Sequence, residues 1–74
     1  MTNEQFELKT GFIDLLQLLK ATGYAATGGE AKMMVEDGLI DVNGEQESRK
    51  RRKLRLGDKV NIDGRVLIVL VTSV

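Results

Sequence analysis

The first third of the chain carries two hydrophobic patterns in succession. Between residues 5 and 9, Phe6 and Leu8 alternate with polar neighbours, and this period of two predicts a short strand or extended arm. The next apolar side chains recur at the i, i+3, i+4 and i+7 spacing of one helical face: Phe12, Leu15, Leu16 and Leu19. This spacing predicts an amphipathic helix from Phe12 onward, with Asp14 in its first turn and Gly23 at its end.

A second helix is predicted after a short loop around Tyr24. Thr27-Gly28-Gly29-Glu30 has the spacing of a capping box, in which the Thr27 hydroxyl accepts a free amide hydrogen and Glu30 reaches back. Gly38 supplies the end of the helix. The apolar face of this helix consists of Ala31, Met34 and Val35. The two segments together predict a helical hairpin.

From Leu39 onward the hydrophobic period changes to two, which predicts strands. Asn43-Gly44 and Asp63-Gly64 are tight-turn dipeptides and indicate two hairpins. The alternating apolar positions are Ile40, Val42, Leu54, Leu56, Val60, Ile62, Val66, Ile68 and Leu70. The predicted fold class is therefore α+β, with a two-helix hairpin packed on one face of a small antiparallel β-sheet.

The length of 74 residues allows one small domain, expected over residues 1–74 with a core from about 6 to 71. Cysteine and histidine are absent, which removes disulfides, thiolate metal ligands and the usual general base near neutral pH. The longest apolar run, residues 66–71, is far shorter than the roughly 20 residues of a membrane span. Because residues 1–5 also lack the pattern of a signal peptide, we expect a cytoplasmic protein.

The sequence offers no arrangement of catalytic residues. A nucleophile–base pair would need a Ser or Thr with a Lys, and no spacing suggests one. Gly28-Gly29 could present free amides to a phosphate, but the segment lacks the Gly-Lys-Ser/Thr ending of a nucleotide-binding loop, and Glu30 would repel the anion. We therefore expect no enzymatic activity, no cofactor and no metal site.

Charge is distributed unevenly although the net charge is zero. Residues 1–48 hold nine acids and three bases, whereas residues 49–74 hold eight bases and two acids. Lysines on a sheet edge discourage edge pairing, which accounts for the alternating Lys53 and Arg55 but not for four consecutive bases at Arg49–Arg52. Because such bases repel one another without an anion, we expect a nucleic-acid contact surface whose side chains are not neutralised by carboxylates of the same molecule.

The remaining residues favour structured RNA as the nucleic acid. Phe6 and Phe12 belong to predicted apolar faces, so only Tyr24 is left as an aromatic for stacking. The second helix carries a single base, Lys32, among acids, which does not suit a reader of the DNA major groove. Recognition of backbone and shape remains, as is typical for structured RNA. If about four or five bases contact phosphates, log affinity should fall against log salt with a slope of about −3 to −4.5.

Several motifs follow one another in the order of a known family. They are Leu18-Leu19-Lys20, Thr27-Gly28-Gly29-Glu30-Ala31-Lys32, the Gly-Leu-Ile-Asp-Val-Asn-Gly of residues 38–44 and the Lys-Leu-Arg-Leu-Gly-Asp-Lys-Val of residues 53–60. Over about residues 6–71 the chain resembles the RNA-binding domain named after ribosomal protein S4, the S4 domain. It is most similar to the small stand-alone bacterial members, whose Glu-x-Arg-Lys/Arg-x-x-Lys pattern is matched at residues 47–53.

The resemblance implies an α+β module that binds structured RNA, often ribosomal or transfer RNA, through the helix pair and the adjoining sheet edge. Thr27 matches the hydroxyl residue that opens the second helix, and Lys32 matches the base one turn later. Many members place Arg directly after the hydroxyl residue, where this chain has Gly28-Gly29-Glu30. The RNA contacts are therefore expected to shift from the second helix to residues 49–53. The predicted RNA-binding residues are Lys32, Arg49, Lys50, Arg51, Arg52 and Lys53.

Two other interpretations of the sequence stay open. Residues 66–71 are apolar at consecutive positions, which favours a protein-interaction strand or a weak homodimer and is compatible with RNA binding. The basic run could also bind another polyanion or an anionic membrane surface. The family resemblance further implies association with ribosomes, and it implies no catalytic domain in this chain.

Overall fold

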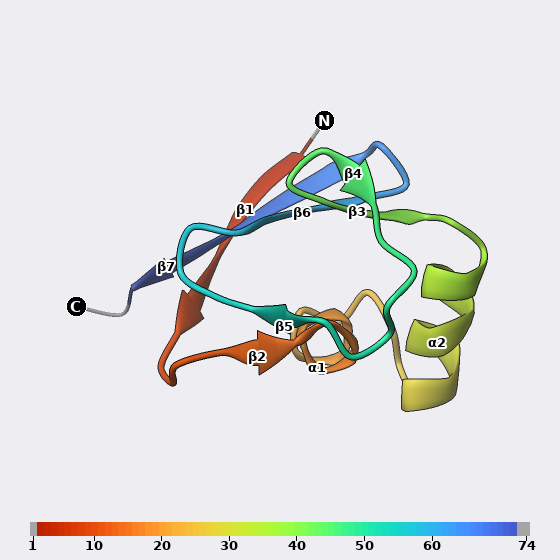
Figure 1. The fold of residues 1–74 in the computed structure, drawn as a ribbon, viewed down its shortest axis with the longest axis horizontal. Coiled ribbons are helices and arrows are strands. Elements are labelled where there is room, and N and C mark those ends of the chain that lie inside the picture. The colour runs from red at the N-terminus through yellow and green to blue at the C-terminus, as the bar shows by residue number, and fades with distance from the viewer. Residues whose placement is uncertain (1, 73–74) are drawn as a thin grey trace.

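The computed structural model describes residues 2–72, which form two helices and seven short strands (Figure 1). Their bounds, in chain order, are β1 Thr2–Leu8, β2 Ile13–Asp14, α1 Leu15–Ala21, α2 Gly28–Glu36, β3 Ile40–Val42, β4 Glu45–Gln46, β5 Lys53–Leu54, β6 Lys59–Ile62 and β7 Val66–Thr72. The larger sheet has the order β1-β7-β6-β3-β4, and β2 pairs with β5 in a separate two-stranded sheet. The predicted α+β class with a helical hairpin on a small sheet is confirmed.

The larger sheet is mixed, whereas the sequence pattern predicted an antiparallel one. β1 runs parallel to β7, with Thr2 opposite Val66 and Leu8 opposite Thr72, while β7, β6, β3 and β4 pair antiparallel to one another. Parallel strands need a long crossover, and here the crossover consists of the whole chain between β1 and β7. The alternation of Phe6 and Leu8 predicts a strand but does not indicate whether that strand pairs parallel or antiparallel to its neighbour.

The first helix begins three residues later than its hydrophobic spacing predicted. Asp14 is its N-cap, with extended backbone and a carboxylate that accepts a hydrogen bond from the Gln17 amide at 2.8 Å. Aspartate is a strong N-cap, and Ile13–Asp14 pairs with Lys53–Leu54 as a strand. Phe12 therefore lies outside the helix with 44% of its surface exposed, and its assignment to the helical apolar face was wrong.

The second helix begins and ends as predicted. The Thr27 hydroxyl oxygen accepts a hydrogen bond from the Glu30 amide at 3.1 Å. The Glu30 carboxylate reaches back to the Ala26 amide rather than to Thr27, at a longer 3.4 Å. Asp37 caps the C-terminal end, and Gly38 follows in the left-handed region with a φ of +76°. This backbone conformation favours glycine, because L side chains rarely adopt it.

Both tight turns that the sequence predicted are present. Asn43-Gly44 joins β3 to β4 and Asp63-Gly64 joins β6 to β7, and both residues of each pair have positive φ. This is the conformation of a type I′ turn, whose twist matches that of the strands it connects. The turns therefore fix the pairing of the strands that support the helices.

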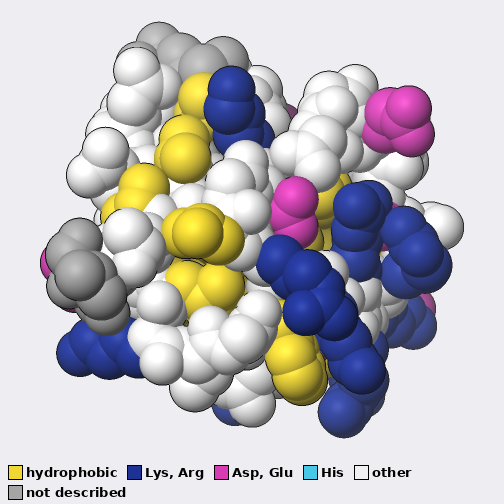
Figure 2. Space-filling model, turned by 60° about the vertical axis from the view of Figure 1, so that its left-hand side comes forward, with side chains coloured by type: hydrophobic (Ala, Val, Ile, Leu, Met, Phe, Trp, Pro, Cys, Tyr) yellow, Lys and Arg dark blue, Asp and Glu magenta, His cyan; other side chains and the backbone are white. Residues whose placement is uncertain are grey.

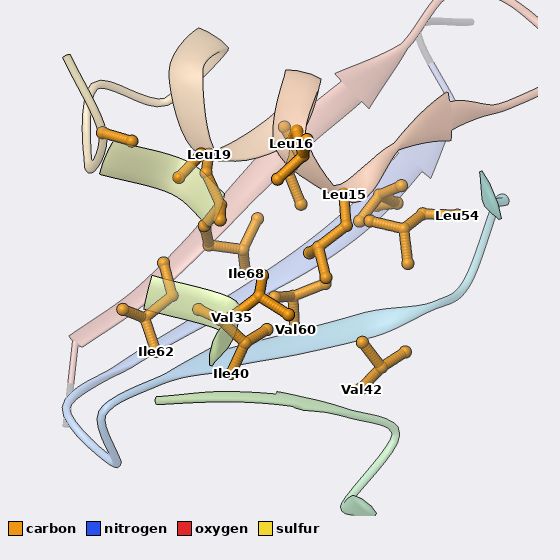
Figure 3. Close-up of a cluster of buried hydrophobic side chains, with 14 of the residues drawn as sticks. Leu15, Leu16, Leu19, Val35, Ile40, Val42, Leu54, Val60, Ile62 and Ile68 are labelled. Carbon is orange, nitrogen blue, oxygen red and sulfur yellow. The ribbon is translucent and has the colours of Figure 1, made fainter. Parts of the chain in front are cut away.

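One hydrophobic core lies between the helical hairpin and the larger sheet (Figure 3). Leu15, Leu18 and Leu19 of α1 are fully buried against Ile40, Val60 and Ile68 of the sheet. The opposite face of β7 carries Leu67, Val69 and Val71, which remain partly exposed. The apolar run of residues 66–71 thus divides between the core face and an open face of the sheet. Neither helix of residues 2–72 is long and apolar enough to cross a membrane.

Candidate nucleic-acid interface

The basic segment, residues 49–55, follows β4 along the chain and includes β5. It holds all six clustered bases, and Lys and Arg side chains gather into one dense band on the face drawn in Figure 2. The segment is tied to the first helix because the Leu15 amide donates to the Arg52 carbonyl oxygen at 2.9 Å. A turn closes within it, where the Arg52 amide donates to the Arg49 carbonyl oxygen at 3.3 Å. The bases are thus held on a defined backbone.

The Glu47 ion-pair cluster consists of Glu47, Arg49 and Arg52. The Glu47 side chain is only 6% exposed, and it accepts hydrogen bonds from Arg49 Nε at 3.1 Å, Arg49 Nη2 at 3.1 Å and Arg52 Nη1 at 2.7 Å. The Arg49 backbone amide also donates to this carboxylate, at 2.9 Å. The turn over residues 49–52 brings its first and last residues to the same side, so both guanidinium groups reach one buried carboxylate.

These contacts lower the pKa of Glu47 to about 2, from an ordinary value of 4.5. The hydrogen bonds from Arg49 are the largest cause, burial of the carboxyl opposes them, and Arg52 lowers the pKa further. Glu47 also raises the pKa of Arg49. The cluster is therefore fully charged at neutral pH and holds the basic segment in one conformation.

The expectation that the bases are not paired with carboxylates of the same chain was wrong for three of them. Besides Arg49 and Arg52, Lys50 Nζ lies 2.8 Å from the Glu36 carboxylate at the end of α2. Both partners of that pair are substantially exposed, and exposed pairs contribute little and are easily exchanged. The sequence argument failed because it treated the run as isolated, whereas Glu47 lies just before it and Glu36 comes from a distant helix.

The cationic hollow is a shallow depression of about 210 Å³ between the two helices and the basic segment. Three cations line it: Lys20 from α1, Lys32 from α2 and Arg51 from the turn. Among residues 2–72, none of these three side chains forms an ion pair with a carboxylate. The hollow is also lined by Asp14, Leu16, Gln17, Gly28 and Gly29. Asp14 is the single acid against three bases, so the hollow attracts anions.

The other four predicted binding residues are not part of the lining of this hollow. Of the six predicted residues, only Lys32 and Arg51 line it together. Lys53 lies further along β5, with its Nζ 4.9 Å from the centre of the Phe12 ring. Lys20 was missed, although it follows Gln17 at the i+3 spacing on the polar side of the first helix. Tyr24, the aromatic left for stacking, instead donates a hydrogen bond to the Glu4 carboxylate.

No group of three or more Asp and Glu side chains among residues 2–72 is placed to hold a metal ion. The Glu47 carboxylate, whose pKa is lowered to about 2, contacts arginines rather than a cleft. The geometry favours binding of an extended anion.

Comparison with known proteins agrees with this geometry. The family model described as the S4 domain matches residues 6–70. YbcJ of Escherichia coli, which carries the name of an RNA-binding protein, is 36% identical over 52 residues, covering 70% of this chain and 74% of YbcJ. RlbA of Bacillus subtilis, named as a ribosome maturation protein, is 39% identical over 57 residues, covering 77% of this chain and 80% of RlbA.

A solved structure shares the fold as well. The solution structure of E. coli YbcJ, described as having an αL motif involved in RNA binding, superposes with a TM-score of 0.63 at 33% identity, covering 93% of this chain and 87% of YbcJ. The chain therefore belongs to the S4 domain family, as the motif order predicted. It is an RNA-binding protein of the small bacterial type that YbcJ represents.

Proposed function

We propose that this protein binds structured RNA of the ribosomal or transfer type through the cationic hollow and the exposed part of the basic segment. The observation that carries the proposal is the convergence of Lys20, Lys32 and Arg51 from three separate elements, none of them in an ion pair among the described residues. Three like charges brought together repel one another, and a phosphate backbone removes that repulsion while releasing its own counterions.

The Glu47 ion-pair cluster supports the same surface indirectly. Arg49 keeps 69% of its side chain exposed although Glu47 holds two of its nitrogens. An arginine fixed in this way loses little conformational freedom when its remaining donors contact a phosphate. Arg52 is 28% exposed and serves mainly to hold the segment in place. We therefore assign Arg49 and Lys53 to the RNA contacts beside the hollow and Arg52 to their support.

The glycines at the start of α2 leave room for the RNA backbone. A side chain at Gly28 would meet no atom within 4 Å, and one at Gly29 would meet only the Thr27 hydroxyl at 3.8 Å. The floor of the hollow is therefore open, and a phosphate can approach Lys20 and Lys32 without steric hindrance. This part of the surface carries no side chain of its own, so the cations on its rim supply the attraction.

The protein acts by binding rather than by catalysis in this proposal. Relatives are named as RNA-binding and ribosome maturation proteins, and the described surface has cations in place of an acid–base pair. We infer an association with ribosomal particles or their precursors in the bacterial cytoplasm, where ribosomal and transfer RNA are found. The binding surface would then position the protein on folded RNA.

A second candidate function rests on the open face of β7. Leu67, Val69 and Val71 lie there partly exposed, beside polar side chains of β1 and β6. Such a stripe suits a weak homodimer, which is compatible with RNA binding on the other side. Sedimentation at two protein concentrations tests it, and an unchanged monomer mass at both would exclude it.

The experiment that tests the main proposal is a salt titration of binding to a structured RNA. We expect the affinity of the chain for purified transfer RNA to fall between about 50 and 200 mM salt with a log–log slope of about −3 to −4.5. The double variant Lys32→Glu with Arg51→Glu should bind at least 100-fold more weakly and with a shallower slope.

The control is Arg65→Glu, which makes the charge change of one of these two substitutions at an 84% exposed side chain in the β6–β7 hairpin. It should change the affinity less than threefold. Heparin, which has the charge but not the shape of RNA, should compete weakly. A flat salt dependence, or equal losses in the double variant and in the control, would contradict the proposal.

A further inference from the structure

An exposed aromatic ring with two cations over it lies at the start of β2. We call this group, Phe12 with Lys53 and Arg55, the aromatic platform. Lys53 Nζ lies 4.9 Å from the ring centre and Arg55 Cζ lies 5.8 Å from it. Phe12 is 44% exposed and is one of only three aromatic residues in the chain. The sequence pattern had placed this ring in the core, so its exposure needs an explanation.

The platform is rigid at its base. Ile13 pairs with Leu54, which is fully buried, and Thr10 Oγ1 donates a hydrogen bond to the Phe12 carbonyl oxygen at 2.7 Å. The backbone on both sides of the ring is therefore fixed by the fold. A ring held in this way loses little entropy when a ligand covers it.

The platform adjoins the cationic hollow. Asp14 lines the hollow, and Phe12 lies two residues before it, immediately ahead of β2. Two residues of chain span at most roughly 7 Å, so the ring is attached close to the rim of the hollow. A polynucleotide with a phosphate in the hollow can therefore place the base of a neighbouring nucleotide over the Phe12 ring.

Charge and energy favour a nucleobase as the occupant. Among residues 2–72, neither Lys53 nor Arg55 has a carboxylate partner for its side-chain charge. An exposed cation–π contact is worth about 2- to 5-fold in an equilibrium constant, whereas a base stacked on an aromatic ring is worth about 5- to 150-fold. A base can therefore displace the lysine from the ring, and the displaced ammonium group becomes available to the adjacent phosphate.

We propose that Phe12 is a stacking site for one unpaired base of the bound RNA, with Lys53 and Arg55 contacting the flanking phosphates. This inference rests on the proposed function and makes it more specific. The proposed ligand is a folded RNA that displays a bulged or looped-out base next to a helix. Unpaired bases are the usual targets of aromatic side chains in RNA recognition.

A tryptophan at position 12 gives a direct test, because the chain contains no other tryptophan. Phe12→Trp should bind an RNA hairpin with one bulged adenosine, and its fluorescence should be quenched on binding. The same hairpin with an abasic nucleotide at the bulge should bind with much less quenching, and heparin should not quench. Equal quenching by the abasic hairpin or by heparin would overturn the stacking proposal.

Affinity gives a second and independent test. Phe12→Ala and Phe12→Leu should weaken binding to the bulged hairpin by about 5- to 100-fold, while Phe12→Tyr should restore it. None of the three should change the salt slope, since no phosphate contact is lost. Met33→Ala, which truncates another exposed apolar side chain, is the matched control and should change affinity less than twofold. Thermal unfolding by circular dichroism checks that each variant folds.

The outcomes separate this inference from the proposed function. If the wild-type chain binds the bulged hairpin with a steep salt slope but Phe12→Leu binds equally well, the stacking site is wrong and the RNA surface stands. If the wild-type chain binds neither hairpin nor transfer RNA, the proposed function fails and the stacking site falls with it.

Discussion

Arg51 and Arg52 are adjacent in the sequence and have the same side chain, yet they lie in different surroundings. Arg52 is 28% exposed and its guanidinium group lies 2.7 Å from the buried Glu47 carboxylate. Arg51 is exposed, has no carboxylate partner among the described residues and lines the cationic hollow with Lys20 and Lys32. The turn over residues 49–52 produces this difference, because it directs its end residues toward Glu47 and its middle residues outward.

This difference shows that a basic run can have two roles at once. Arg52, at the end of the turn, helps to give the segment its shape through an internal anion, whereas Arg51 beside it forms no ion pair among the described residues. Charge density along the sequence does not distinguish the two roles. Substitutions that affect folding and binding separately do distinguish them.

Glu47→Ala should have the largest effect on stability. It removes the common partner of Arg49 and Arg52 and leaves the partly buried Arg52 charge without a carboxylate. We expect a loss of about 2 to 3 kcal/mol in the free energy of unfolding, which corresponds to a melting temperature lower by about 10 to 20 °C for a domain of this size. Thermal unfolding followed by circular dichroism measures it.

The matched control for that substitution is Glu45→Ala, at an exposed position two residues earlier in β4. It should change the melting temperature by less than about 2 °C, as surface substitutions usually do. If the two variants melt alike, Glu47 does not hold the basic segment together.

Acid should weaken the protein through the same carboxylate. The pKa of Glu47 is about 2 in the folded chain and 4.5 without its partners, so its contribution is complete above pH 4.5 and disappears as the pH falls from about 4.5 to about 2. We expect a loss of about 2 kcal/mol over that window. Urea unfolding at several pH values measures it.

Glu47→Gln should lose most of this acid dependence and keep only the smaller part from other carboxylates, such as Glu36, whose pKa Lys50 lowers. The same decline in stability with falling pH in both proteins would show that another group is responsible.

Gly28→Arg should have the smallest effect and strengthen binding. A side chain at this position meets open space at the hollow, and many members of the family carry an arginine directly after the hydroxyl residue. One added phosphate contact should raise affinity for transfer RNA about fivefold at 0.1 M salt and make the salt slope steeper by about 0.7 to 0.9. Gly28→Ala is the control, and equal affinities of the two variants would mean that RNA does not enter the hollow here.

Much of the fold could be predicted because its signals are local. Asn43-Gly44 and Asp63-Gly64 specify their turns by backbone preference alone, and Thr27 specifies a helix start by its hydroxyl group. The start of the first helix could not be predicted from spacing, because the pairing of Ile13 with Leu54 is a contact between residues far apart in the chain. The same pairing leaves Phe12 outside the helix and exposed. The assignment of Phe12 to the helical apolar face therefore prevented the proposed stacking site from being predicted.

The candidate site was only partly predictable for a related reason. Lys32 and Arg51 could be selected from the family motifs, but the approach of Lys20 to them depends on how the two helices pack. The roles of Arg49 and Arg52 depend on the burial of Glu47, whose amide donates to the Ile40 carbonyl oxygen at 2.9 Å. A sequence shows the charges, and the packing decides which of them face one another.

The most direct test of this account compares the salt dependence of RNA binding in Arg51→Ala and Arg52→Ala, measured at a temperature at which both are folded. Arg51→Ala should make the log–log slope for transfer RNA shallower by about 0.7 to 0.9, the loss of one phosphate contact, without changing stability. Arg52→Ala should keep the wild-type slope and lower the melting temperature. Equal changes of slope in the two variants would contradict the division of roles between these neighbouring arginines.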